Sequence, residues 1–192
     1  RDPVERAASH FAMITDPNAT PAQRRTRGTA WIGRSFADVA LDELRDLVRQ
    51  GLLICSENEV SLTADFRVDF DKLDSVLSRL PNSHGSHSLL LRGLYAIQLK
   101  PWLDAYPKSS FAFVRSEHLS ISPQRTRDIV LKLQRHAGLE DHPLDLKDAE
   151  IKHNARHRDP LPPDIRSQLE LFYTPFLAHL DALISKNDWI EG

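Results

Sequence analysis

The chain opens with an arginine and a serine whose spacing suits the binding of a phosphate group. Arg1 precedes Asp2-Pro3, which is typical of a helix start because Asp caps free N–H groups and Pro fits the first helical position. Arg1 would lie beside the positive end of that helix, with Ser9 roughly 10 Å along it. An arginine side chain covers most of this gap, so one phosphate could bond to both residues. The alternative is a solvated arginine and a serine on the helix surface.

A second candidate anion site lies in the segment 151–160, IKHNARHRDP. Lys152, Arg156 and Arg158 crowd this segment shortly before a predicted C-terminal helix. Lysine supplies a point charge and arginine a planar fork of donors, so together they could clamp an anion. A solvated basic loop explains the same residues equally well.

Four further arginines could meet an anionic acceptor. Arg24, Arg25 and Arg27 cluster in a stretch rich in Pro, Asn, Thr and Gly, for which a plain solvated loop is the alternative. Arg92 stands at the head of an apolar helical pattern and is expected to be exposed.

An aromatic stripe follows in the segment LRGLYAIQLKPWL. Helical spacing would place Tyr95, Gln98 and Trp102 on one side of a helix. Such a stripe is more typical of a buried core than of a cofactor site, so we expect these rings to pack inside.

The remaining reactive residue types indicate neither a metal centre nor a nucleophile. Two histidine pairs, His84 with His87 and His153 with His157, come without a carboxylate or cysteine at fixed spacing. Cys55 is the only cysteine, which excludes a disulfide within the chain and a multi-cysteine zinc site. The sequence contains no nucleophile–base pair and no glycine-rich phosphate loop; its seven glycines are scattered.

The composition is that of an ordinary globular chain of one domain, with 192 residues, 41% hydrophobic and 27% charged. Its net charge of −2 means that a polyanion would have to meet a local basic patch, and we predict no nucleic-acid partner. No run approaches the roughly 18 apolar residues that span a bilayer.

Hydrophobic periodicity predicts a mostly helical chain. Helices are expected from Pro3 to just before Asp16 and over 36–53, 69–80, 88–107, 122–139 and 163–184. The run SFAFVRS at 110–116 predicts a buried strand, because it is rich in aromatic and β-branched residues. The segments 15–34 and 83–88 are expected to be loops, the first with at most a short irregular helix. This order suggests an α/β domain from which most parallel strands are missing.

Taken together, these segments resemble the C-terminal two-thirds of a sulfotransferase that uses 3′-phosphoadenylyl sulfate (PAPS), closest to the heparan-sulfate type and its bacterial and algal relatives. RDPVERAAS, from Arg1 to Ser9, resembles the family's 3′-phosphate motif. Two later stretches, GLYAIQLKPWLDAYP before an apolar run and SEHL, and KHNARHRDPLPPDIRSQLELFYTPFLAHLDALISKNDW, resemble its later segments. The resemblance covers 1–14 and roughly 88–189, with the three motifs in the family's order.

The resemblance implies an α/β, P-loop-like three-layer fold, here truncated and mostly helical with few parallel strands. Residues 1–192 would form a single sulfotransferase domain. Its acceptor-side loop and helices would lie at 15–87, and its C-terminal core and cofactor-closing loop at 88–192.

The resemblance also assigns roles to individual residues. Arg1 and Ser9 would hold the 3′-phosphate of PAPS, and Lys152 and Arg156 would complete the cage. The chain departs from the family where a glycine before that last arginine is replaced by Ala155. It also lacks the family's disulfide hairpin and adenine-facing aromatic before the closing loop.

The implied activity is the transfer of a sulfuryl group to a hydroxyl or amine of a saccharide, without a metal. Arg24, Arg25, Arg27 and Arg92 would face the acceptor. The 5′-phosphosulfate loop and the catalytic base are expected upstream of residue 1, so these 192 residues are expected to be inactive alone. The alternative is a non-catalytic helical interaction module. The compartment stays open between the Golgi lumen or membrane of a eukaryote and the cytoplasm of a bacterium.

Overall fold

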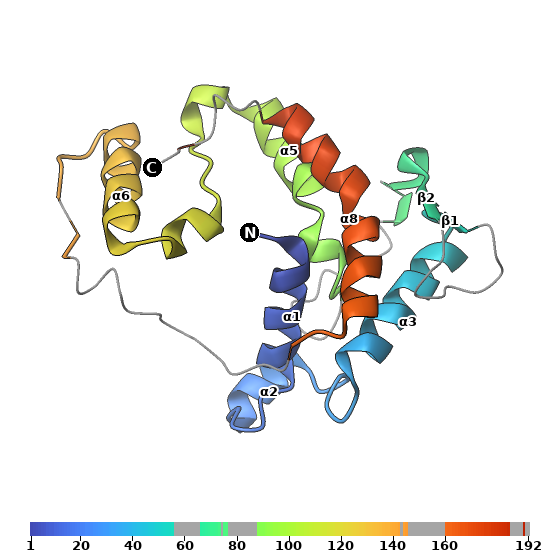
Figure 1. Cartoon of the computed structure of the whole chain (residues 1–192). Coiled ribbons are helices and arrows are strands. Elements are labelled where there is room, and N and C mark those ends of the chain that lie inside the picture. The colour runs from blue at the N-terminus through green and yellow to red at the C-terminus, as the bar shows by residue number, and fades with distance from the viewer. Residues whose placement is uncertain are drawn as a thin grey trace. The chain divides into compact units, whose positions relative to one another are not determined.

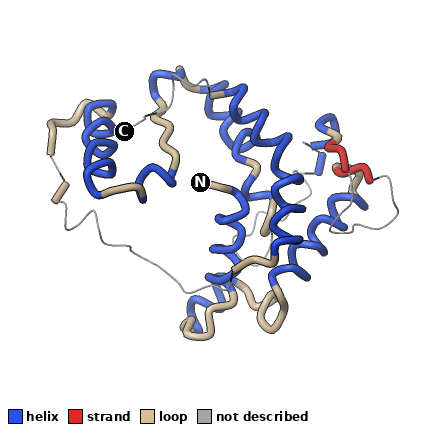
Figure 2. The backbone as a smooth tube through the Cα atoms, viewed as in Figure 1, coloured by secondary structure: helices blue, strands red, loops and turns tan. Residues whose placement is uncertain are grey.

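The computed structural model describes residues 1–55, 66–73, 75–76, 88–142, 144–145, 160–184 and 190. Helices dominate this part of the chain, and its only sheet has two short strands (Figures 1 and 2). The chain divides into two compact units. Unit 1 consists of Arg1–Asp2, Tyr95–Ala155 and Leu177–Gly192, and unit 2 consists of Pro3–Leu94 and Arg156–Phe176.

Unit 2 combines helices from both ends of the sequence. Figure 1 shows α1 beside α8, and an ion pair between Glu5 and Arg166 joins the two helices. The helix α8 belongs to this unit as far as Phe176. The elements are α1 (Pro3–Ile14), α2 (Pro21–Arg27), α3 (Phe36–Arg49), β1 (Leu53–Cys55), β2 (Phe66–Val68), the 3₁₀ turns η1 (Phe70–Lys72) and η2 (Leu91–Gly93), and α8 (Pro163–Leu183).

The helix α3 shows how local sequence and burial combine. Its N-cap is Ser35, whose hydroxyl accepts the N–H of Asp38 at 3.1 Å. Apolar residues at helical spacing line its inner face: Phe36, Val39, Ala40, Leu44 and Leu47.

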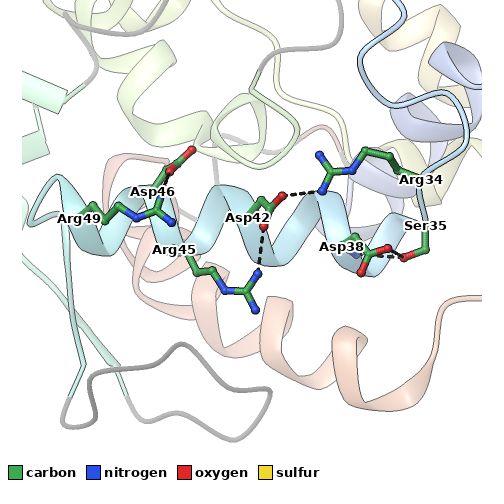
Figure 3. A network of polar contacts seen from close by, with 7 residues as sticks. All are labelled: Arg34, Ser35, Asp38, Asp42, Arg45, Asp46 and Arg49. Atoms are coloured by element: carbon green, nitrogen blue, oxygen red, sulfur yellow. Dashed lines mark hydrogen bonds and ion pairs between the residues drawn. The ribbon is translucent and has the colours of Figure 1, made fainter.

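The outer face of α3 carries a network of polar contacts (Figure 3). Asp42 accepts hydrogen bonds from both Arg34 and Arg45, and Arg49 pairs with Asp46 one turn further along. These pairs are exposed, so each stabilises the helix by only a few tenths of a kcal/mol, on the order of 0.3.

A buried irregular turn lies in the core of unit 2. The residues 88–94, here called the 88–94 turn, include Leu89, Leu90 and Leu94, each at most 1% exposed. The hydroxyl of Tyr173, on α8, donates to the carbonyl oxygen of Leu90 at 2.8 Å. At Gly93 a β-carbon would lie 2.7 Å from Tyr173 Cε1 and 2.9 Å from the Cβ of Pro3, so a larger residue does not fit.

The sheet of unit 2 bears on the predicted fold class. The strands β1 and β2 run antiparallel, with Leu53 opposite Val68. Among the described residues there is no parallel strand pair, so the parallel part of the predicted three-layer α/β fold is not seen, whereas its mostly helical character is confirmed.

Unit 1 is also helical. Ala96, Leu180 and Ile184 form a buried cluster against which Leu99 and Phe113 pack. The elements are α5 (Tyr95–Ala105), η3 (Lys108–Ser110), η4 (Ser116–Ser120), α6 (Pro123–His136) and the end of α8. The hydroxyl of Ser122 caps α6 by accepting the N–H of Arg125, and Gly138, with φ of +71°, follows its end, so the helix falls within the predicted range 122–139.

One predicted element of unit 1 is wrong, and another is confirmed only over 95–105. The expected strand at 110–116 is extended backbone between η3 and η4. Among the described residues, its only backbone hydrogen bond from a distant segment comes from the N–H of Ile190, which donates to the oxygen of Phe113 at 2.8 Å. The expected helix at 88–107 is broken at Gly93 and Leu94, and α5 then continues through Pro101 to Ala105.

The N-terminal predictions are closer. The helix α1 spans the predicted residues, and the segment 15–34 contains the short helix α2. The predicted helix 69–80 starts with η1, capped by Asp69; residues 74 and 77–80, like most of the loop 83–88, lie outside the described residues.

Candidate functional site

Of the two residues predicted to bind the 3′-phosphate, Arg1 precedes α1 and Ser9 lies on it. Arg1 is exposed and belongs to unit 1, and Ser9 is half-buried on α1 in unit 2. The N–H of Asp2 donates to Oε1 of Glu117 at 2.8 Å, which holds the chain directly before the helix. Within the described residues, neither the Arg1 guanidinium nor the Ser9 hydroxyl has a hydrogen-bond partner. The joint binding of one phosphate by the two side chains stays a prediction.

The arginines of α2 divide into two kinds. Arg24 donates to the carbonyl oxygen of Pro17 at 2.9 Å, and Arg27 donates to that of Met13 at 3.1 Å, so both hold the backbone that links α1 to α2. Arg25 is exposed and, among the described residues, has no such contact. Arg25 is therefore the arginine of the three best suited to meet an acceptor.

Arg92 lies in a polar cluster that the sequence did not indicate. Glu43, on α3, accepts the backbone N–H of Leu90 at 3.0 Å and that of Leu91 at 3.3 Å. Arg6, on α1, donates to the carbonyl oxygen of Leu89. Arg6 and Glu43 thus contact the 88–94 turn, and Arg92 belongs to it. We call these three residues the Glu43 cluster.

Burial shifts the pKa values of Glu43 and Arg92 toward their neutral forms, and neighbouring charges modify both shifts. Burial raises the pKa of Glu43 to about 7, although the N–H groups of the 88–94 turn and the charge of Arg6 favour its ionised form. Burial, together with repulsion by Arg6, lowers the pKa of Arg92, while Glu43 raises it. Arg92 is half-buried, not exposed as expected. The cluster places two guanidinium groups around one carboxyl that titrates near neutrality, which is a chemistry often found at functional sites.

The predicted cofactor-closing residues lie outside the part of the chain that the structure describes. Lys152 and Arg156, predicted to complete the cofactor cage, lie outside the described residues, as do both histidine pairs. In the part of the chain that the structure describes, no three His, Cys, Asp or Glu side chains gather as metal ligands would. None of the described helices has the length and apolar character needed to cross a bilayer.

The aromatic stripe lies partly outside the core. Trp102 is 59% exposed and Tyr106 is 53% exposed, and Gln98 is also exposed one turn before Trp102. The rings of Trp102 and Tyr106 stack with centroids 6.1 Å apart and planes 21° apart. Tyr95 is half-buried against the cluster of Ala96. The expectation of a buried stripe is wrong for Trp102 because the inner face of α5 is formed by Ala96 and its neighbours.

Two features of the structure were not predicted from the sequence. Glu43 lies in a helix whose other acids are solvated, so its residue type carries no sign of its contact with a turn 47 residues later. Tyr106 follows Trp102 by four residues, and this spacing was available as a signal of a stacked pair.

Comparisons with protein families, with curated proteins and with solved structures find no match to this chain.

Proposed function

We propose that the chain is part of a PAPS-dependent sulfotransferase that transfers a sulfuryl group to a hydroxyl or amine of a saccharide. The observation that carries the proposal is the run RDPVERAAS, together with the start of α1 at Pro3, directly after Arg1 and Asp2. A helix start preceded by an arginine favours an anion, because the N-terminal N–H groups and the guanidinium both attract it.

In this proposal the chain anchors the donor nucleotide. Sulfuryl transfer forms a bond from the acceptor oxygen or nitrogen to sulfur, while the bond from sulfur to the 5′-phosphate oxygen breaks. Adenosine 3′,5′-bisphosphate leaves, and the acceptor proton passes to a base. No base and no 5′-phosphosulfate loop is assigned among these 192 residues. The binding energy of the 3′-phosphate, remote from the sulfur, aligns the sulfuryl group for in-line attack.

The other proposed contacts follow the order of the chain. Lys152 and Arg156 would close over the nucleotide. On the acceptor side, Arg25 is the first candidate, because Arg24 and Arg27 already bond to backbone carbonyls. Arg92 is a weaker candidate than Arg25, since it is half-buried beside Glu43.

The test compares two nucleotides that differ in one phosphate. Calorimetric titration of the 192-residue chain with adenosine 3′,5′-bisphosphate should give tighter binding than titration with adenosine 5′-monophosphate. Arg1→Ala and Ser9→Ala should remove this preference. Loss of a charge-assisted contact by Arg1 should weaken bisphosphate binding by roughly 10- to 150-fold, equivalent to about 1.5–3 kcal/mol.

Arg49→Ala is the matched control, because Arg49 is an exposed arginine of α3 that pairs only with Asp46 in Figure 3. It should leave the preference unchanged. Equal binding of the two nucleotides, or a preference that survives both Arg1→Ala and Ser9→Ala, would overturn the proposal and favour a non-catalytic interaction module.

A further inference from the structure

We propose that Trp102 and Tyr106 form a stacking platform for a sugar ring of the acceptor. Trp102 lies on α5, and Tyr106 directly follows the end of this helix. The N–H of Tyr106 donates to the carbonyl oxygen of Trp102 at 2.9 Å, so the two side chains, four residues apart, lie on one face. The two rings stack on each other with planes 21° apart, so a ligand would cover the outer surface of this pair. The proposal deepens the proposed function and rests on it only for the role of the sugar as sulfuryl acceptor.

The core of unit 1 is already filled without the rings of Trp102 and Tyr106. The inner face of α5 is already filled by Ala96 and Leu99, which pack with Leu180 of α8 and with Ile184 directly after it. Trp102 and Tyr106 lie outside this cluster and keep more than half of their surface exposed. An indole and a phenol ring with this exposure leave apolar surface in contact with water, which a ligand with an apolar face could cover.

The size of the patch favours a sugar over a protein. Two aromatic side chains, each about half exposed, offer on the order of 200 Å² in total. A stable protein interface needs about 800 Å² from each partner. On α5, Trp102 is the large apolar side chain described as more than one-third exposed, and Tyr106 directly follows the helix, so the patch does not extend back along α5.

The neighbouring residue types suit hydroxyl groups. Gln98, exposed one turn before Trp102, brings an amide that both donates and accepts hydrogen bonds. Beyond Tyr106 the chain continues into Lys108, Ser109 and Ser110, all exposed. The ion pair of Lys100 and Asp104, with N and O 2.7 Å apart, lies on another face of the helix and leaves the rings uncovered. A pyranose could place its C–H face on the rings and its hydroxyls at these polar ends.

The test measures the binding of three unsulfated tetrasaccharides by saturation-transfer NMR and calorimetry. They are β-linked glucose, β-linked N-acetylglucosamine, and alternating N-acetylglucosamine and glucuronate. At least one should bind, and Trp102→Ala and Tyr106→Ala should each weaken it roughly tenfold, as for other rings stacked on aromatic side chains. Trp102→Phe should recover most of the affinity, because it restores a planar ring.

Leu139→Ala is the control for loss of an exposed apolar side chain, since Leu139 is 62% exposed in the same unit. It should bind saccharide like the original chain. The platform is overturned if no tetrasaccharide binds, or if Trp102→Ala binds as well as the original chain. It is also overturned if sedimentation shows a dimer that Trp102→Ala dissociates, which would make the patch an interface between two copies.

A failure of the sugar platform can be distinguished from a failure of the proposed function. Trp102→Ala should bind adenosine 3′,5′-bisphosphate as the original chain does. If the original chain binds a saccharide through Trp102 but shows no preference for the bisphosphate, the platform stands and the sulfotransferase assignment fails. If the chain prefers the bisphosphate but binds no saccharide through Trp102, only the platform is overturned.

Discussion

Glu43 is the residue whose ionisation should matter most for stability. Its pKa is raised from about 4.5 to about 7 by burial, so the folded chain binds a proton more tightly than the unfolded chain does. The stabilisation is therefore fully present below pH 4.5 and is lost as the pH rises through 7. Because the side chain is half-buried, we expect the loss to be on the order of 1–3 kcal/mol.

The substitution Glu43→Gln should remove this pH dependence, because the amide oxygen still accepts the N–H groups of Leu90 and Leu91 but carries no charge. Urea unfolding at a series of pH values between 4.5 and 8 measures the effect. Asp42→Asn is the control: the hydrogen bond from Arg34 lowers the pKa of exposed Asp42, so its titration falls below this range. A slope that persists in Glu43→Gln would assign the effect to other groups.

Single residues were predictable where the signal is local. The caps Ser35 and Ser122 are each read from their own helix, because a cap bonds to an N–H three residues on. Glu43 could not be predicted, since its partners are backbone groups of the 88–94 turn. The exposure of Trp102 likewise depends on which face of α5 the helix α8 covers.

At the scale of elements, the fit between α1, α8 and the 88–94 turn depends on the absence of a side chain at Gly93. The change Gly93→Ala should lower the free energy of unfolding by about 3 kcal/mol, because the new methyl group would overlap Tyr173 and Pro3. Thermal and urea unfolding measure this loss.

Gly138→Ala is a matched control for Gly93→Ala. Gly138 has φ of +71° and no atom within 4 Å of an added β-carbon, so only the backbone strain of a left-handed residue, about 1–2 kcal/mol, is expected there. Equal losses at the two positions would show that the close packing around Gly93 yields readily.

Helices were predicted better than strands for a physical reason. The helices α3, α6 and α8 carry their hydrogen bonds within the segment, so cap residues and apolar periodicity predict them. A strand needs a partner, and the run at 110–116 has the composition of a strand but, among the described residues, a single backbone hydrogen bond to a distant segment, from Ile190. The actual pair, β1 with β2, consists of three-residue strands that are too short for a pattern.

At the scale of the whole molecule, unit 2 depends on a helix from the far end of the chain. The helix α8 supplies Ile165, Leu169, Phe172 and Tyr173 to its core, each without measurable exposure. A chain ending at residue 162 should therefore lose cooperative unfolding and near-ultraviolet circular dichroism. Addition of a peptide of residues 160–184 should restore both signals.

The matched control is the same peptide with Phe172→Ala and Tyr173→Ala, which should not restore the signals because the buried rings are missing. A shortened chain that unfolds cooperatively without any peptide would show that α1 and α3 form a core by themselves.

At this scale the helical content was predictable from the sequence, whereas the arrangement of a binding site was not. Class and helical content follow from composition and periodicity, and the residues 36–49 and 163–183 fall where the sequence predicts helices. The anchor for a nucleotide rests on RDPVERAAS, and the closing loop lies outside the described residues. A binding site depends on which residues far apart in sequence meet, and local patterns do not contain that information.

The place of α8 in unit 2 also has a consequence for synthesis on the ribosome. The apolar faces of α1 and α3 emerge more than a hundred residues before α8. At about 5–20 residues per second, translation of that interval takes roughly 5–25 s. During this time the two helices have no partner from α8, so the nascent chain should be a substrate for chaperones that bind exposed hydrophobic segments.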